Sequence, residues 1–227
     1  MATTCAGILG DPSPRPEPDL KQAVIVGMLG GPGSGKGTQC QMLSQIFELA
    51  HISIGDVLRQ EINRPGSQYA GIIRENMMAG KVGPKEITIS IVRDHMQRSL
   101  AEGTRAFILD GFPRNMEQCN YFEQIVGPVT LLLVLDCPES TMVERLTRSD
   151  RNRFDDTEDN IRRRIETFQN TTSEVIESFR RRNKLHNVNS DREPGLVRNQ
   201  VEAILDGLVT KRAGMYNTYQ SFISPRA

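Results

Sequence analysis

The stretch Gly30 to Thr38, GGPGSGKGT, places five glycines and one lysine directly after the apolar run AVIVGML. Glycines let successive backbone N–H groups converge on an anion, and a helix that follows adds the positive end of its dipole. The spacing G-x-x-x-x-G-K, which ends at Lys36, therefore predicts a phosphate-binding loop between a strand and a helix. Lys36 is expected to reach the terminal phosphates of a nucleotide.

Two further clusters place charged side chains at the ends of expected elements. In ISIGDVLR, Asp56 can cap a helix that begins near Val57, with Arg59 on its first turn. In RAFILDGFPR, a buried strand ends at Asp110, and the carboxyl ends of strands are where open parallel sheets bind ligands. An aspartate beside a triphosphate site can hold Mg²⁺ through water, because this ion keeps much of its hydration shell.

The segment ERLTRSDRNRFDDTEDNIRRRIETF is dense in arginine and opens a long expected helix. Arginine pairs bidentately with phosphate oxygens and keeps its charge, so arginines that converge on a phosphoryl group would stabilise it. At 100° per residue, Arg164 falls on the flank of an apolar stripe, whereas Arg163 points nearly opposite. We therefore expect Arg164 to point inward. The stripe is Ile161, Ile165, Phe168, Val175 and Phe179.

The elements that must position these clusters alternate along the chain. Short apolar runs (AVIVGML, RAFILD, VTLLLVLDC and LHNVN) are separated by longer segments of helical period. This rhythm predicts a parallel sheet covered by helices on both faces. The prolines of DPSPRPEP predict a disordered leader over residues 1–22, and the segment 213–227 is expected to be a loosely ordered tail. One main domain is expected over residues 23–212.

Composition narrows the class of protein. The 227 residues carry 28 basic and 28 acidic side chains, so no overall field favours nucleic acid or an anionic membrane. No apolar run approaches the roughly 20 residues that span a bilayer. The cysteines form no C-x-x-C pair, which suggests neither a disulfide framework nor a thiolate zinc site and favours the cytoplasm, with the nucleus also open. They are Cys5, Cys40, Cys119 and Cys137. The histidines, which lie outside the clusters, are expected to be structural or surface residues; they are His51, His95 and His186.

Four motifs together resemble the adenylate kinase and UMP-CMP kinase family: GxPGxGKGT, GDxLR, DGFPR, and R-x-D-D with an arginine eleven residues on. The resemblance covers about residues 23 to 210. It implies an α/β fold, namely a P-loop three-layer α/β/α domain with a five-stranded parallel sheet. It also implies a flap over residues 54–83 that binds the acceptor nucleotide, and a short lid over residues 148–157.

The resemblance further implies transfer of the γ-phosphoryl group from ATP·Mg²⁺ to a nucleoside monophosphate, by a monomer. For the transfer itself it assigns Lys36, Arg114, Arg148, Arg153 and Arg164. For ATP it assigns Gly33, Ser34, Gly35, Lys36, Gly37, Thr38, Arg145 and Arg192. For the acceptor it assigns Ile54, Arg59, Lys81, Val82, Gly83, Gly111, Phe112, Pro113, Arg114, Gln118, Arg153 and Arg164. Asp110 would hold Mg²⁺ through water.

The sequence also departs from common patterns. Gly37 follows the loop lysine where Ser or Thr is usual, with Thr38 one step later, and only SDRN separates Arg148 from Arg153. Ile54 together with Gln118 resembles fungal-type uridylate kinases, which predicts UMP or CMP as the acceptor and AMP as a further one. The alternative is a short-lid adenylate kinase that prefers AMP. A more remote alternative is a catalytically silent regulator that binds nucleotides.

Overall fold

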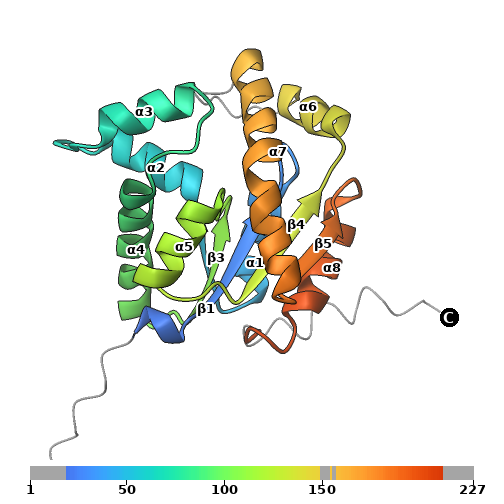
Figure 1. Cartoon of the computed structure of the whole chain (residues 1–227). Coiled ribbons are helices and arrows are strands. Elements are labelled where there is room, and N and C mark those ends of the chain that lie inside the picture. Colours follow the sequence, from blue (N-terminus) through green and yellow to red (C-terminus); the bar gives the residue numbers. More distant parts are fainter. Residues whose placement is uncertain (1–18, 149–153, 155–156, 212–227) are drawn as a thin grey trace, which may run out of the picture.

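A computed structural model describes residues 19–148, 154 and 157–211. Its centre is one sheet of five parallel strands in the order β2-β3-β1-β4-β5, which confirms the predicted sheet (Figure 1). The strands are β1 (Val24–Leu29), β2 (Ala50–Ser53), β3 (Ala106–Asp110), β4 (Leu131–Asp136) and β5 (Leu185–Asn189). The phosphate-loop motif follows β1, so it begins at the middle of the sheet.

Helices cover both faces of the sheet, which confirms the three-layer α/β/α architecture. Alternate residues of β1 face opposite cores: Ile25 packs in a cluster with helices α4, α5 and α7, whereas Val26 packs in a cluster with α1 and α8 (Figure 1). The helices of the described part are α1 (Lys36–Ile46), α2 (Ile54–Asn63), α3 (Ala70–Met78), α4 (Lys85–Ala101), α5 (Met116–Ile125), α6 (Glu139–Thr147), α7 (Glu158–Arg181) and α8 (Pro194–Leu205).

Helix α2 begins three residues earlier than the sequence predicts. The hydroxyl of Ser53 accepts a hydrogen bond from the Asp56 N–H at 3.4 Å, so Ser53 is the N-cap and the prediction of Asp56 as the cap is wrong. The physical reason is that β2 ends at Ser53, which leaves this residue in extended backbone directly before the helix. Asp56 instead lies in the first turn, where a carboxylate favours the helix dipole.

Helices α2 and α3 form most of the segment predicted as the flap, between β2 and β3. The turn between them is held by the Glu61 carboxylate, which accepts hydrogen bonds from Arg64 at 2.7 Å and from Ser67 at 2.6 Å. The hydrogen bond from Arg64 lowers the pKa of Glu61, and this outweighs the effect of burial. The flap therefore has internal polar contacts that fix its shape.

Several predicted boundaries lie outside the described residues. These are residues 1–18 of the predicted leader, most of the lid at 148–157, and the tail at 213–227. Residues Leu20–Gln22 form a short 3-10 helix, and Leu20 is buried in the core, so the packed structure includes residues before Ala23.

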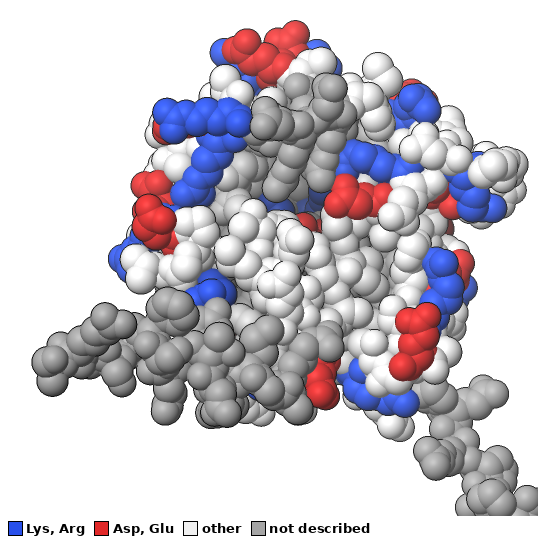
Figure 2. All heavy atoms as spheres, turned by 180° about the vertical axis from the view of Figure 1, so that it is seen from behind, with Lys and Arg blue, Asp and Glu red and all other residues white. Residues whose placement is uncertain are grey.

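The surface of the described residues is mixed in charge. Figure 2, which views the molecule from behind, shows acidic and basic side chains intermixed around the rim of this face, with uncharged residues between them. Among the described residues, none of the helices combines the length and the apolar character that crossing a bilayer requires.

Candidate active site

A cavity of about 590 Å³ brings the four sequence clusters together. It lies where the loops leave the carboxyl ends of β1, β2 and β3, which is where open α/β sheets bind ligands. The predicted site residues that line it are Gly33, Gly35, Lys36, Gly37, Thr38, Ile54, Arg59, Lys81, Val82, Gly83, Asp110, Gly111, Arg114, Gln118, Arg145 and Arg164.

The phosphate loop holds Lys36 folded back on its own backbone. The Lys36 Nζ donates hydrogen bonds to the carbonyl oxygens of Gly30 at 2.7 Å and Gly31 at 2.8 Å. Burial lowers the pKa of Lys36 to about 8, and the charges of Arg114 and Arg164 act in the same direction, while Asp110 opposes them. A cation that is poorly hydrated and surrounded by other cations is well suited to bind an anion.

Glycine is required in this loop at Gly33. Its φ is +84°, a conformation that L side chains rarely adopt, and an added Cβ would lie 2.4 Å from the carbonyl oxygen of Met142. The loop and helix α6 therefore pack backbone against backbone, which leaves no room for any side chain at position 33.

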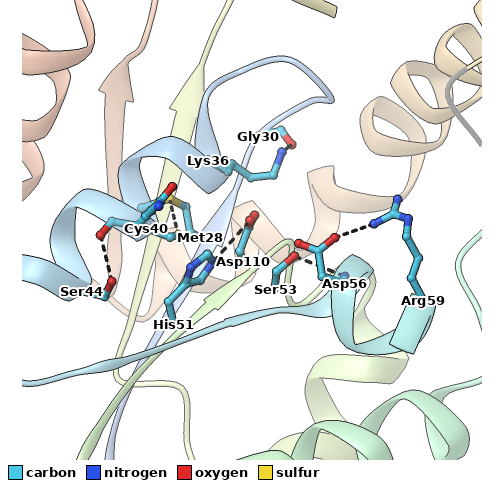
Figure 3. A network of polar contacts seen from close by, with 11 residues as sticks. Met28, Gly30, Lys36, Cys40, Ser44, His51, Ser53, Asp56, Arg59 and Asp110 are labelled. Carbon is cyan, nitrogen blue, oxygen red and sulfur yellow. Dashed lines mark hydrogen bonds and ion pairs between the residues drawn. The ribbon is translucent and has the colours of Figure 1, made fainter. Parts of the chain in front are cut away.

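Asp110 ends β3 and faces the start of helix α1. Its Oδ2 lies 3.5 Å from the point that a Cβ on Gly37 would occupy, and 3.7 Å from the His51 Nε2 (Figure 3). Burial acts to raise the pKa of Asp110, but the neighbouring His51 and the charge of Lys36 together hold it below its usual value. The carboxylate is therefore ionised at neutral pH and faces the phosphate loop.

His51, which the sequence analysis expects to be a structural or surface residue, lines the cavity. Strand β2 pairs with β3 in a register that sets His51 opposite Ile108 and Ser53 opposite Asp110, so His51 lines the cavity. A single histidine in AHIS gives no local signal of this position. The pairing of β2 with β3 brings His51 to the cavity. No sequence pattern within either strand predicts this position.

Arginines enter the cavity from three different elements. The Arg59 Nη1 lies 2.9 Å from Asp56 Oδ1 on the flap, and the Arg114 Nε donates to the carbonyl of Gly111 at 3.1 Å. Arg164 lines the cavity from helix α7, whereas its neighbours Arg162 and Arg163 are exposed. The helical period therefore predicted the inward arginine correctly.

Gln118 is fully packed at the flap side of the cavity. Its side chain is 3% exposed, its Oε1 accepts from the Arg114 backbone N–H at 3.3 Å, and its Nε2 donates to the Gly83 carbonyl at 3.4 Å. One amide hydrogen and one acceptor site remain for a ligand. Ile54, which is 3% exposed, adds an apolar wall.

Other predicted residues do not line the cavity. Ser34 and Phe112 are buried, and Pro113 follows Phe112 in the turn after β3. The Arg148 side chain is 78% exposed and pairs with Glu144 at 2.9 Å. Arg192 is exposed on the loop before α8, and Arg153 lies outside the described residues. By contrast, Arg145 does line the cavity, and it donates to the Ser190 carbonyl at 3.1 Å.

The cavity also has walls that the sequence analysis missed. Thr167 and Thr171 of α7 follow Arg164 by nearly one and two helical turns and line the cavity beside it. The same period that selected Arg164 could have found them. Met77 and Thr88 line it from the flap side, where no charged or glycine-rich motif marks them.

Comparisons with known proteins agree with this geometry. Residues 28–184 match the family model described as adenylate kinase. The chain is 40% identical over 176 residues to a uridylate kinase from Schizosaccharomyces pombe, covering 76% of this chain and 92% of that protein. It is 38% identical over 190 residues to a uridylate kinase from Saccharomyces cerevisiae, covering 82% and 93%. It is also 37% identical over 194 residues to human adenylate kinase isoenzyme 1, covering 85% and 99%.

Proposed function

This chain belongs to the adenylate kinase family, and we propose that it transfers the γ-phosphoryl group of ATP to UMP or CMP, with AMP as a further acceptor. The observation that carries the proposal is that the phosphate loop shares one cavity with arginines from the flap, the β3 turn and helix α7. Such a cavity can hold two phosphorylated ligands end to end, with cations where the phosphates meet.

The proposed roles follow from where each side chain enters. Lys36 and the loop backbone bind the β- and γ-phosphates of ATP, while Arg59 and Arg114 bind the phosphate of the acceptor. Arg164, which lines the same cavity and whose charge acts on Lys36, stabilises the charge on the phosphoryl group in transfer. We propose supporting roles at the phosphates for Arg148 and Arg153 and at ATP for Arg145 and Arg192.

No catalytic base is required from this chain. In phosphoryl transfer, alignment of donor and acceptor, neutralisation of charge and exclusion of water supply most of the rate. The walls of the cavity fit that task, because the flap and α7 enclose it from two sides with Met77, Ile73 and Phe168 among the apolar lining residues. Closure over both ligands would keep water from the γ-phosphate.

The residues present fit Mg²⁺ at Asp110. The ionised carboxylate opens into the cavity beside the phosphate loop, and Mg²⁺ prefers oxygen ligands while it keeps several waters. Asp110 would therefore hold the ion through water. Bound there, Mg²⁺ would neutralise charge on the phosphates of ATP.

The preference for a pyrimidine rests on shape. The free donor and acceptor of Gln118 can pair with the edge of uracil, cytosine or adenine, so this amide does not select one base alone. Ile54 presents bulk and no hydroxyl to the cavity, which favours the smaller bases. The 40% identity with a uridylate kinase, against 37% with human adenylate kinase isoenzyme 1, agrees with this preference.

The test is steady-state ADP formation from ATP·Mg²⁺ with UMP, CMP and AMP as acceptors at matched concentrations. We expect the highest kcat/KM with UMP or CMP. A preference for AMP would contradict the pyrimidine assignment and leave the kinase assignment intact. ATP binding without turnover on any acceptor would contradict the kinase assignment and favour a silent regulator. A monomer that acts in the cytoplasm, with no nucleic acid or membrane partner, completes the proposal.

A further inference from the structure

Three side chains from three separate elements meet next to Lys36. Cys40 comes from α1, His51 from β2 and Asp110 from β3, and one ligand atom of each lies within 4.8 Å of the others (Figure 3). The His51 Nε2 is buried, points at Asp110, and has no hydrogen-bond partner among the residues that the structure describes. We call this set the Cys40–His51–Asp110 cluster.

We propose that the Cys40–His51–Asp110 cluster binds one Zn²⁺ ion, at a site distinct in ligand type from the Mg²⁺ site of the reaction. Thiolate, imidazole and carboxylate are the three ligand types that Zn²⁺ takes in proteins. Mg²⁺ is a hard ion that prefers oxygen alone, so the sulfur and nitrogen of this cluster select against it. The Cys40 thiol releases its proton to water when its sulfur binds the metal.

The spacing of the ligand atoms fits a tetrahedral ion. Zn²⁺ bonds of about 2.0–2.3 Å set neighbouring ligand atoms roughly 3.3–3.7 Å apart. His51 Nε2 and Asp110 Oδ2 are already 3.7 Å apart, and the largest separation in the cluster is 4.8 Å or less. A shift of about 1 Å by the Cys40 side chain would close the site. Its present neighbour is the soft thioether of Met28, whose sulfur lies 3.4 Å from the Cys40 Sγ.

The cluster is open to the cavity on one side. His51 and Asp110 line the cavity, whereas Cys40 is buried behind them, so an ion enters from the cavity and a water completes the fourth position. A Zn²⁺ ion on Asp110 withdraws this carboxylate from Mg²⁺·ATP. Zn²⁺ is therefore an inhibitor of the enzyme; this effect rests on the proposed role of Asp110, and the binding itself does not.

The direct test uses Co²⁺ as a spectroscopic substitute for Zn²⁺ on the full chain, with no nucleotide present. We expect one equivalent of Co²⁺ to give the near-ultraviolet charge-transfer band of a Co²⁺–thiolate bond, and Zn²⁺ to abolish it by displacement. Cys40→Ala should lose the band. Cys119→Ala is the matched control, because Cys119 is equally buried but lies near Arg182 and outside the cluster, and it should keep the band.

Circular dichroism would show whether Cys40→Ala folds. If it does not, His51→Ala provides a second test of the site. It keeps the thiol but removes one ligand, so we expect Co²⁺ affinity to fall by about tenfold or more. Absence of the band in the parent protein, its survival in Cys40→Ala, or unchanged affinity in His51→Ala would each overturn the site.

A kinetic test addresses inhibition separately. At fixed ATP·Mg²⁺ and acceptor, with free Zn²⁺ held constant by a metal buffer, we expect kcat of the parent to fall by about tenfold or more. Cys40→Ala should resist the ion. Equal inhibition of both proteins would show that Zn²⁺ acts elsewhere and would overturn the inhibitory role. If the parent has no kinase activity, the proposed function fails while the Co²⁺ measurement still decides the metal site.

Discussion

Asn160, on the first turn of α7, donates a hydrogen bond of 3.1 Å from its side-chain amide to the carbonyl oxygen of Met77 on α3. Asn160 is 3% exposed, so this bond lies in a packed contact between the flap and helix α7. Gly80 contributes to the same contact: its φ is +65°, and an added Cβ would lie 2.9 Å from the Asn160 Oδ1. The Arg74 guanidinium lies over the Phe154 ring at 5.4 Å nearby.

Asn160→Ala should weaken closure of the flap. Loss of one buried hydrogen bond costs about 1 kcal/mol, which corresponds to roughly a fivefold change in an equilibrium constant. We expect KM for the acceptor nucleotide to rise by about this factor. Asn199→Ala, at an exposed asparagine on α8, is the control and should leave KM unchanged. Equal KM values in the parent and Asn160→Ala would show that the contact does not contribute to closure.

Arg164 should be essential to the rate and its neighbour Arg162 should not. Arg164→Lys keeps the charge but loses the planar fork of donors, so we expect kcat to fall by about a hundredfold or more with a smaller change in KM. Arg162→Lys is the matched control, because Arg162 is exposed on the same helix and pairs with Glu158 at 2.8 Å. Similar kcat values for the two variants would remove Arg164 from the transfer step.

ATP affinity should fall as pH rises above about 8. Lys36 has a pKa of about 8 in the free site, lowered by burial, and the phosphates of ATP raise the pKa again by favouring the charged amine. Binding above pH 8 therefore takes up a proton, whereas below pH 8 the amine is already charged and no uptake is required.

Calorimetry at pH 9 in two buffers of different ionisation enthalpy measures this uptake directly. Lys36→Arg is the control, because its guanidinium stays charged throughout this pH range and should take up no proton on binding. Proton uptake of the same size in Lys36→Arg would assign the effect to another group. The thiol of Cys40 does not interfere, since burial and then Asp110 raise its pKa well above the usual value.

Two glycines of the phosphate loop should differ in their tolerance of alanine. Both have positive φ, +84° at Gly33 and +95° at Gly35. Substitution of either glycine by alanine therefore lowers the free energy of unfolding by about 1–2 kcal/mol through backbone strain alone. At Gly35 no atom lies within 4 Å of an added Cβ, whereas at Gly33 the Met142 carbonyl oxygen lies 2.4 Å away.

We therefore expect Gly33→Ala to lower the melting temperature clearly more than Gly35→Ala, as measured by thermal unfolding followed by circular dichroism. The difference between the two variants isolates the clash with Met142, because the backbone cost is similar in both. Equal melting temperatures would mean that α6 moves away from the loop at little cost.

Much of the fold could be predicted because β1, β3 and β4 are apolar runs and because short runs alternate with helical segments up to β5. The runs AVIVGML, RAFILD, VTLLLVLDC and LHNVN became β1, β3, β4 and β5. Strand β2 has only four residues, AHIS, and too few apolar side chains to stand out from a loop. The same short strand places Ser53 as the cap of α2, which is why the start of that helix was misplaced.

The residues of the candidate site likewise fall into those with a local sequence signal and those without one. Lys36, Arg59, Asp110 and Arg114 line the cavity and each belongs to a local motif, while the helical period sets the direction of Arg164. His51 and Asn160 carry no local signal, since their contacts with Asp110 and Met77 join segments that are distant in sequence. Positions of this kind follow from tertiary packing, which a pattern within one segment does not contain.

The order β2-β3-β1-β4-β5 has a consequence for how such a protein can diversify. The residues proposed to contact the acceptor base, Ile54, Gly83 and Gln118, occur before β4 in the chain, whereas Arg145 of α6 and Arg164 of α7 occur after it. The two strands that follow β1 in the chain, β2 and β3, lie on one side of it in the sheet, and the last two, β4 and β5, lie on the other. Mutation or recombination between β2 and β4 can therefore change which nucleotide is accepted while the arginines encoded after β4 are inherited unchanged.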